Sequence, residues 1–171
     1  MEDSEKLRQK LVDFKNSTDE NEKEKLWKDE ISQLIKKVIF FVGMGYEGDD
    51  LNAPVFDPDV HCFPGAATRI QSEGILPDLG PYSLSQTAST QIMHFRTLKN
   101  PMLGEEWLSA FTSFDEMLPV WAGRCHFALA TFDDMKNFYK PSMGILINCM
   151  SGCFRLPPEK IEYIDKGGKQ D

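Results

Sequence analysis

Cysteines and histidines are the residues of this chain best suited to do chemistry near neutral pH. They fall into three groupings: His61-Cys62, Cys125-His126 and Cys149-x-x-x-Cys153. Together these groupings carry enough ligands for a zinc ion. Zinc sites usually bring two ligands together on a C-x-x-C knuckle, and none of the groupings has that spacing. We therefore expect no metal and no cofactor, and we expect the cysteines to behave as small hydrophobic side chains.

A catalytic cysteine would need a base within hydrogen-bonding reach and a third group that orients the base. Cys125 and His126 are neighbours on an expected strand, so their side chains should point to opposite faces. The serine nucleophile elbow, the P-loop and the H-E-x-x-H metalloprotease motif are missing from the sequence. We predict no catalytic residue and no enzyme. The alternative is a metal-dependent or thiol enzyme in which Cys149 and Cys153 act with His61 or His126.

The segment Gly43-x-Gly45-x-x-Gly48 formally matches a dinucleotide-binding fingerprint. That fingerprint needs a helix whose N-terminal amides hold the pyrophosphate. Here Asp49, Asp50 and prolines follow, so carboxylates occupy the place of the phosphate. The acidic residues of this stretch also lack the spacing and the closing Glu of a calcium-binding EF-hand. The sequence therefore predicts an acidic loop without a cofactor.

Charge and composition favour a protein partner. The net charge of −8 argues against nucleic acid, because phosphate binding needs a surface rich in Lys and Arg, and it argues equally against an anionic membrane surface. Residues 1–37 carry ten acidic and nine basic side chains, so most of the negative charge lies in the rest of the chain. We expect Trp121 to be exposed in a loop, where it would suit an interface. The predicted partner-binding residues are Glu47, Asp49, Asp50, Asp57, Asp59 and Trp121, and the partner is expected to be basic.

No stretch of about 18 apolar residues could span a membrane. The N-terminus is charged and no apolar signal region follows it, so the chain is expected to be cytoplasmic, with reduced cysteines. The oligomeric state does not follow from the sequence. One further alternative is that residues 1–37 mediate self-association as a helical hairpin.

The elements that must position these residues follow from hydrophobic periodicity and from turn signals. Residues 1–37 form a charged helical segment of two helices, the second capped by Ser17 with Glu20 or by Asp19 with Glu22. Residues 38–165 form a single α+β domain. Residues 52–81 hold five of the ten prolines and are predicted to be an irregular insertion, and 166–171 a disordered tail. Strands are expected at 38–42, 91–98, 107–111, 126–131, 144–148 and 154–156, with a hairpin formed by those at 91–98 and 107–111. Helices are expected at 114–118, capped by Ser113 with Glu116 and ended by Pro119, at 132–139, capped by Thr131 with Asp134, and at 158–164.

The order of these features resembles that of the SseB family, in particular its N-terminal domain. The segments that carry the resemblance are Leu108-Ser-Ala-Phe111-Thr112-Ser113, the 114–118 helix, Gly144-Ile-Leu-Ile-Asn148, Ser151-Gly152, the closing 156–164 segment and, upstream, 27–42. Two departures stand out. Ser109-Ala110 replaces an apolar residue or proline, and Cys149 replaces the proline that usually follows the Asn.

The resemblance implies an α+β fold with a mixed β-sheet flanked by helices. It transfers no catalytic residue, and it implies a bacterial, cytoplasmic protein. Some members resemble accessory or immunity proteins near secretion and toxin systems. The expected function is therefore a non-enzymatic protein-binding or accessory module. An immunity-type protein that neutralises a basic toxin surface is a specific version of this expectation.

Overall fold

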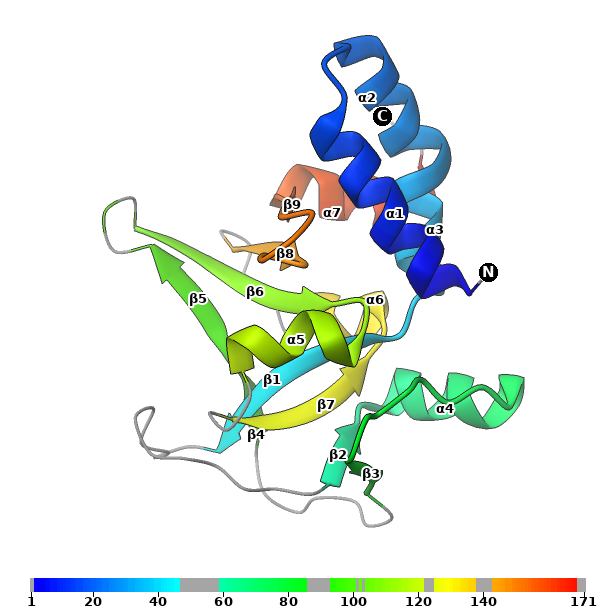
Figure 1. The fold of residues 1–171 in the computed structure, drawn as a ribbon, viewed down its shortest axis with the longest axis vertical. Helices are drawn as coiled ribbons and strands as arrows, with labels where there is room; N and C mark the ends of the chain where they lie inside the picture. Colours follow the sequence, from blue (N-terminus) through cyan, green and yellow to red (C-terminus); the bar gives the residue numbers. More distant parts are fainter. Residues whose placement is uncertain are drawn as a thin grey trace.

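The computed structural model describes residues 2–46, 59–85, 93–100, 102, 104–121, 125–137 and 143–168. It shows one mixed β-sheet flanked by helices, with a helical segment at the N-terminus (Figure 1). The predicted α+β fold is confirmed.

The N-terminal segment forms two long helical stretches. Helix α1 (Asp3–Asn16) is followed by a second stretch made of α2 (Glu20–Leu26), a π-helical turn η1 (Trp27–Ile31) and α3 (Ser32–Lys37). Asp19 caps the second stretch, since its carboxylate accepts a hydrogen bond from the Asn21 N–H at 2.9 Å. Among the described helices, none is long and apolar enough to cross a membrane.

Within the described residues the sheet has nine strands, in the order β3-β2-β7-β1-β6-β8-β9, with β4 paired to β1 and β5 paired to β6. The strands are β1 (Phe40–Tyr46), β2 (Asp59–Cys62), β3 (Ser83–Leu84), β4 (Met93–Phe95), β5 (Thr97–Asn100), β6 (Glu105–Phe111), β7 (His126–Ala130), β8 (Gly144–Ile147) and β9 (Phe154–Leu156). The remaining helices are α4 (Pro64–Glu73), α5 (Phe114–Trp121), α6 (Phe132–Lys136) and α7 (Pro158–Asp165). The pairs β2–β3, β2–β7 and β6–β8 are parallel and the others are antiparallel.

Strands β1 and β6 pair directly at only two positions, around Phe41 and Phe111. Beyond these positions β4 pairs with β1 and β5 pairs with β6, so the 93–100 segment lies between the two strands as a wedge. The predicted strand at 91–98 is thus divided in two at Arg96, whose N–H donates to the Gly43 carbonyl at 2.8 Å. The predicted hairpin between this segment and 107–111 is confirmed.

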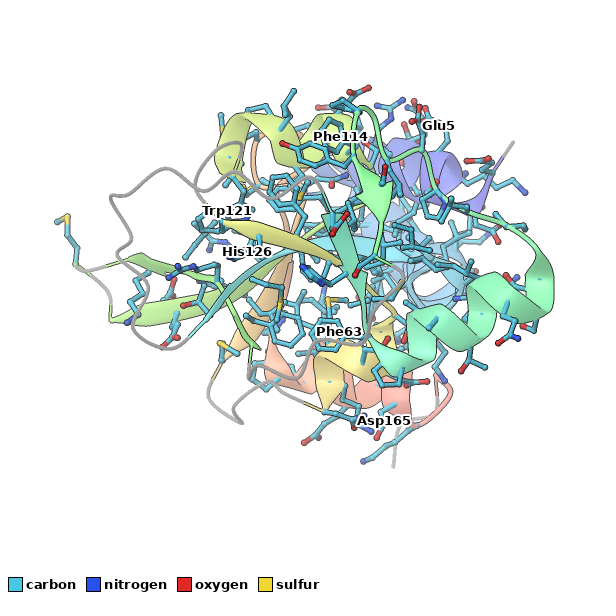
Figure 2. All side chains as sticks on the ribbon, turned by 90° about the horizontal axis from the view of Figure 1, so that it is seen from below. Glu5, Phe63, Phe114, Trp121, His126 and Asp165 are labelled. Carbon is cyan, nitrogen blue, oxygen red and sulfur yellow. The ribbon has the colours of Figure 1, made fainter. Side chains whose placement is uncertain are left out.

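The two faces of the sheet bury two hydrophobic clusters. The N-terminal helices, α6 and α7 cover one face, and the larger cluster there includes Leu7, Leu11, Trp27 and Ile35. Helix α5, part of α4 and the segment around Leu79 cover the other face. Figure 2 shows Phe63 and Phe114 on opposite sides of the strands. The N-terminal helices are therefore part of the same core as the sheet.

The prediction of an irregular 52–81 segment is wrong over β2 and α4. Pro64 stands at the first helical position of α4, where an N–H would have no intrahelical partner. The next two amides, of Gly65 and Ala66, donate to the buried Asp134 carboxylate at 2.9 Å each. The same carboxylate closes the predicted capping box of α6 with Thr131. One acid therefore holds the starts of two helices.

Two other predictions need correction. Gly43 and Gly45 lie within β1 instead of opening an acidic loop. Helix α5 continues through Pro119 to Trp121, because a proline near the end of so short a helix removes only one internal hydrogen bond. Helix α6 ends at Lys136, and the predicted helical residues 138–139 lie outside the described residues.

Candidate functional site

Most of the predicted partner-binding acids cannot be placed. Glu47, Asp49, Asp50 and Asp57 lie outside the described residues, and Asp59 is the first residue of β2, where it is partly exposed. The prediction that these acids contact a partner remains a prediction.

The prediction that Trp121 lies in an exposed loop is wrong. The residue lies at the end of α5, where it is half-buried. Its indole packs over β1: a Cβ added at Gly43 would lie 3.1 Å from Trp121 Nε1 and 2.9 Å from Cys125 Sγ. The indole N–H is buried and has no hydrogen-bond partner among the described residues. Figure 2 shows the residue where α5 meets the sheet. Trp121 is thus mainly a core residue, and Gly43 provides the space for it.

The cysteines and histidines of the enzyme alternative are not brought together. His61 and His126 lie side by side on β2 and β7, with ring centroids 6.3 Å apart. Cys149 follows β8, and strands β7, β1 and β6 separate β8 from β2. Because neighbouring strands are ~4.8 Å apart, this separation is roughly 19 Å. Among the described residues no group of three His, Cys, Asp or Glu side chains could hold a metal ion.

All four cysteines are free thiols. Burial raises the pKa of the Cys62 thiol to about 11 and that of the Cys125 thiol to about 12. Burial also raises the pKa of the Cys149 thiol, and its neighbour Cys153 adds to the shift. These three thiols stay protonated at neutral pH, whereas a nucleophilic cysteine needs its thiolate.

A buried polar cluster lies where the parallel strands β6 and β8 end. The side chain of Asn148 accepts from the Thr112 N–H and donates to Thr112 Oγ1, both at 2.9 Å. The Asn148 carbonyl accepts from the N–H groups of Ser151 and Cys153. Asn148 has a φ of 50°, a conformation that Asn tolerates better than most residues. It thereby fixes both Thr112 and the turn after β8.

Next to Thr112 lies a cleft of about 320 Å³, which we call the α1–α4 cleft. Its walls come from the start of α1, the junction between α3 and β1, the end of α4 with the segment that follows, and the end of β6. The residues that line it are Glu2, Asp3, Ser4, Lys37, Val38, Ile39, Arg69, Glu73, Ile75, Pro77 and Thr112. Elements distant in sequence therefore converge there.

The α1–α4 cleft has an apolar floor and an apolar rim. Val38 and Ile39 are buried in the core beneath it. After Gly74 ends α4 in the left-handed conformation, Ile75 and Leu76 are 56% and 50% exposed. They are the only adjacent pair among the exposed large hydrophobic residues of the described chain. Adjacent exposed aliphatic side chains beside a cleft are typical of an interaction surface.

Arg69 fixes the shape of the cleft. Its guanidinium donates to the carbonyls of Lys36 and Lys37, at the end of α3, and contacts the Glu73 carboxylate at 3.4 Å. The last carbonyls of a helix have no intrahelical partner, so this contact satisfies two of them and holds α4 against α3. Because Arg69 is engaged in these bonds, Glu2 and Asp3 dominate the charge at the α1 side of the cleft.

Sequence reasoning missed this cleft because it treated residues 52–81 as irregular. The signal that could have found α4 is Pro64 followed by helix-forming residues up to Gly74, a helix-ending glycine. No local signal places α4 beside α1.

No family model, no curated protein and no solved structure matches this chain. These comparisons neither support nor contradict the resemblance to the SseB family, which stays a prediction.

Proposed function

We propose that this protein is a non-enzymatic protein-binding module and that its partner docks in the α1–α4 cleft. The observation that carries the proposal is the adjacent exposed pair Ile75 and Leu76, beside a cleft whose floor is apolar. Burial of two such side chains in a complex supplies roughly 25 cal/mol for each Å² of apolar surface removed from water.

The partner presents an apolar side chain that enters the cleft and Lys or Arg residues that meet Glu2 and Asp3. The net charge of −8 supports a basic partner, because complementary charge speeds association. The resemblance to the SseB family, with its implied bacterial and cytoplasmic setting, favours an accessory or immunity-type role. In the immunity-type version, the module would cover a basic surface of a toxin.

Loss of partner binding in a cleft variant tests the proposal. The wild type and the double variant Ile75→Ser/Leu76→Ser are each immobilised and used to capture proteins from a cell extract. A partner whose capture depends on Ile75 and Leu76 is then produced in pure form. Calorimetry should show at least about tenfold weaker binding by the double variant, equivalent to about 1.4 kcal/mol. Binding should also weaken as salt concentration rises.

A matched control is Leu118→Ser/Met150→Ser, which removes two exposed hydrophobic side chains from other parts of the surface. This control should bind like the wild type. Equal binding by the cleft variant and the control, or binding that salt does not change, would contradict the proposal.

A further inference from the structure

A second concavity, of about 410 Å³, lies at the other end of α1. It is bounded by the end of α1, by α2, by the turn before β9 and by the start of α7, which Figure 1 shows close together. We call it the lysine pocket. Its lining residues are Phe14, Lys15, Lys23, Gly152, Cys153, Phe154, Arg155, Pro157 and Lys160.

The charge of the lysine pocket is opposite to that of the chain. None of the described residues that line it is acidic, although the chain carries 27 acidic residues and a net charge of −8. Arg155 alternates with the inward-facing Phe154 and Leu156, so its guanidinium points to the other face, where it lies 6.0 Å from the Trp107 ring. Three lysines therefore supply the charge of the pocket.

Lys160 is the most constrained of the three lysines. Its ammonium lies over the rings of Trp27, Phe154 and Phe14, at 4.6, 5.0 and 5.3 Å from their centroids. Within the described part of the chain it forms no salt bridge, and the nearby Glu24 pairs with Lys28 at 3.0 Å. Loss of hydration on burial lowers the pKa of Lys160, and the negative charges of Glu24 and Glu159 partly oppose that shift. A half-buried cation held this way favours an anion in its vicinity.

The other two lysines also have capacity for an anion. Lys23 also lies over the Phe14 ring, with Nζ 5.3 Å from the ring centroid. It has no salt bridge in the described part of the chain. Lys15 donates one hydrogen bond to the Ser151 carbonyl at 2.9 Å, which leaves two of its three protons.

The aromatic wall of the pocket is made of rings that pack against one another. Phe14 meets Phe154 edge to face at 5.1 Å, and Trp27 stacks on Phe154 at 5.8 Å. Trp27 is also the first residue of the π-helical turn η1. Such turns interrupt α-helices rarely and are often found at functional sites. The turn at Gly152 and Cys153 is fixed by Asn148, whose carbonyl accepts a hydrogen bond from the Cys153 N–H.

We infer that the lysine pocket binds an organic phosphate monoester. Three ammonium groups around one concavity are opposite in charge to a phosphate dianion, for which lysine is a common ligand. The volume exceeds that of the phosphate group, which leaves room for the organic part of the ligand beside the partly exposed Phe14. None of the residues that line this pocket lines the α1–α4 cleft, so the inference does not rest on the proposed protein partner.

Titration of the full chain with phenyl phosphate tests the inference, with inorganic phosphate and benzoate as the matched probes. Phenyl phosphate should bind with a Kd of about 1 mM or tighter. Inorganic phosphate should bind more weakly, because it lacks the apolar part, and benzoate more weakly still, because it carries a single charge. Amide NMR signals of 152–155 should shift on binding.

Two variants and one control complete the test. Lys160→Met keeps the packing of the side chain and removes its charge, and it should weaken phenyl phosphate binding at least about tenfold. Lys23→Gln, a milder change, should weaken it about threefold to tenfold. Lys25→Gln removes the same charge from the same helix but does not line the pocket, so binding should not change.

The inference is overturned by any of three results: no binding of phenyl phosphate, equal binding of benzoate, or equal weakening by Lys25→Gln and Lys23→Gln. If Lys160→Met does not fold, Lys23→Gln alone decides between the outcomes.

Discussion

The α1–α4 cleft and the lysine pocket lie at the two ends of one helix and differ in charge, in the kind of apolar surface and in their relation to the core. The 14 residues of α1 separate them by about 20 Å. The cleft combines carboxylates with exposed aliphatic side chains, whereas the pocket combines lysines with packed aromatic rings. The first turn of α1 is acidic and its last turn basic, which is the arrangement that the helix dipole favours. Helix stability and ligand charge thus favour the same residues at both ends.

The two regions also differ in their relation to the core. Trp27, under the lysine pocket, is 4% exposed and belongs to the larger core cluster, while Ile75 at the cleft is 56% exposed. Changes at the pocket should therefore cost stability, and changes at the cleft rim should not. Three predictions test this difference, from the largest effect to the smallest, and a fourth concerns thiols outside both regions.

Trp27→Ala should lower the free energy of unfolding by about 3–5 kcal/mol, because it leaves a cavity beneath Phe154 and Lys160. Ile75→Ala should change it by less than about 0.5 kcal/mol. Urea denaturation of both variants measures the contrast. Equal losses in the two variants would remove the distinction between a pocket built on the core and a cleft built on the surface.

Asn148→Gly should lower stability by about 2–3 kcal/mol, because the buried Thr112 N–H loses its acceptor. Glycine accepts the positive φ, so strain does not contribute. Asn148→Ala should cost roughly 1 kcal/mol more, since Ala is strained at φ 50°. Asn148 supports both regions, so binding of the protein partner in the cleft and of phenyl phosphate in the pocket should weaken together. An effect confined to one region would show that the regions are supported separately.

Arg69→Met should lower stability by about 1 kcal/mol, because two carbonyls at the end of α3 lose their donor. Hydrogen exchange in α4 should speed up, while exchange around the lysine pocket should stay as in the wild type. Glu73→Gln, which removes only an exposed ion pair, should have little effect. Faster exchange at 152–160 in the Arg69 variant would contradict the assignment of Arg69 to the cleft alone.

High pH should lower stability through thiols that belong to neither region. The pKa of Cys125 is raised to about 12 and that of Cys62 to about 11, so the folded protein holds their protons above pH 9, where the unfolded chain releases them. The stability they contribute is fully present below pH 9 and is lost as pH rises towards 12. Urea midpoints between pH 7 and 10.5 measure the decline, which Cys125→Ala should make shallower. An identical decline in that variant would exclude Cys125 as a cause.

Local elements were well predicted, because their determinants lie close together in sequence. The Thr131–Asp134 capping box, the Ser113 cap, whose hydroxyl accepts from the Glu116 N–H, and the alternating strands β6 and β7 are examples. Helix α4 has local signals in Pro64 and Gly74, but the carboxylate that caps it, Asp134, lies 69 residues beyond Gly65 and could not be predicted from its neighbours in sequence. Trp121 was misplaced because Pro119 was treated as a stop for the helix.

The candidate sites could not be predicted from the sequence. The cleft assembles residues from 2 to 112, and the lysine pocket joins residues 14–23 to 152–160. Periodicity shows that Phe14 and Trp27 face inward, but it does not show that Phe154 and Lys160 meet them. Only the strand order brings β9 and α7 beneath the N-terminal helices.

The contact of Trp27 with Phe154 and Tyr163 has a consequence for the order in which the chain can fold. During synthesis, residues 20–37 leave the ribosome well before residues 154–163, and domains complete their folding only when their partners have emerged. Until then the N-terminal helices expose an apolar face that includes Trp27. The nascent chain should therefore depend on chaperones until β9 and α7 emerge and cover that face.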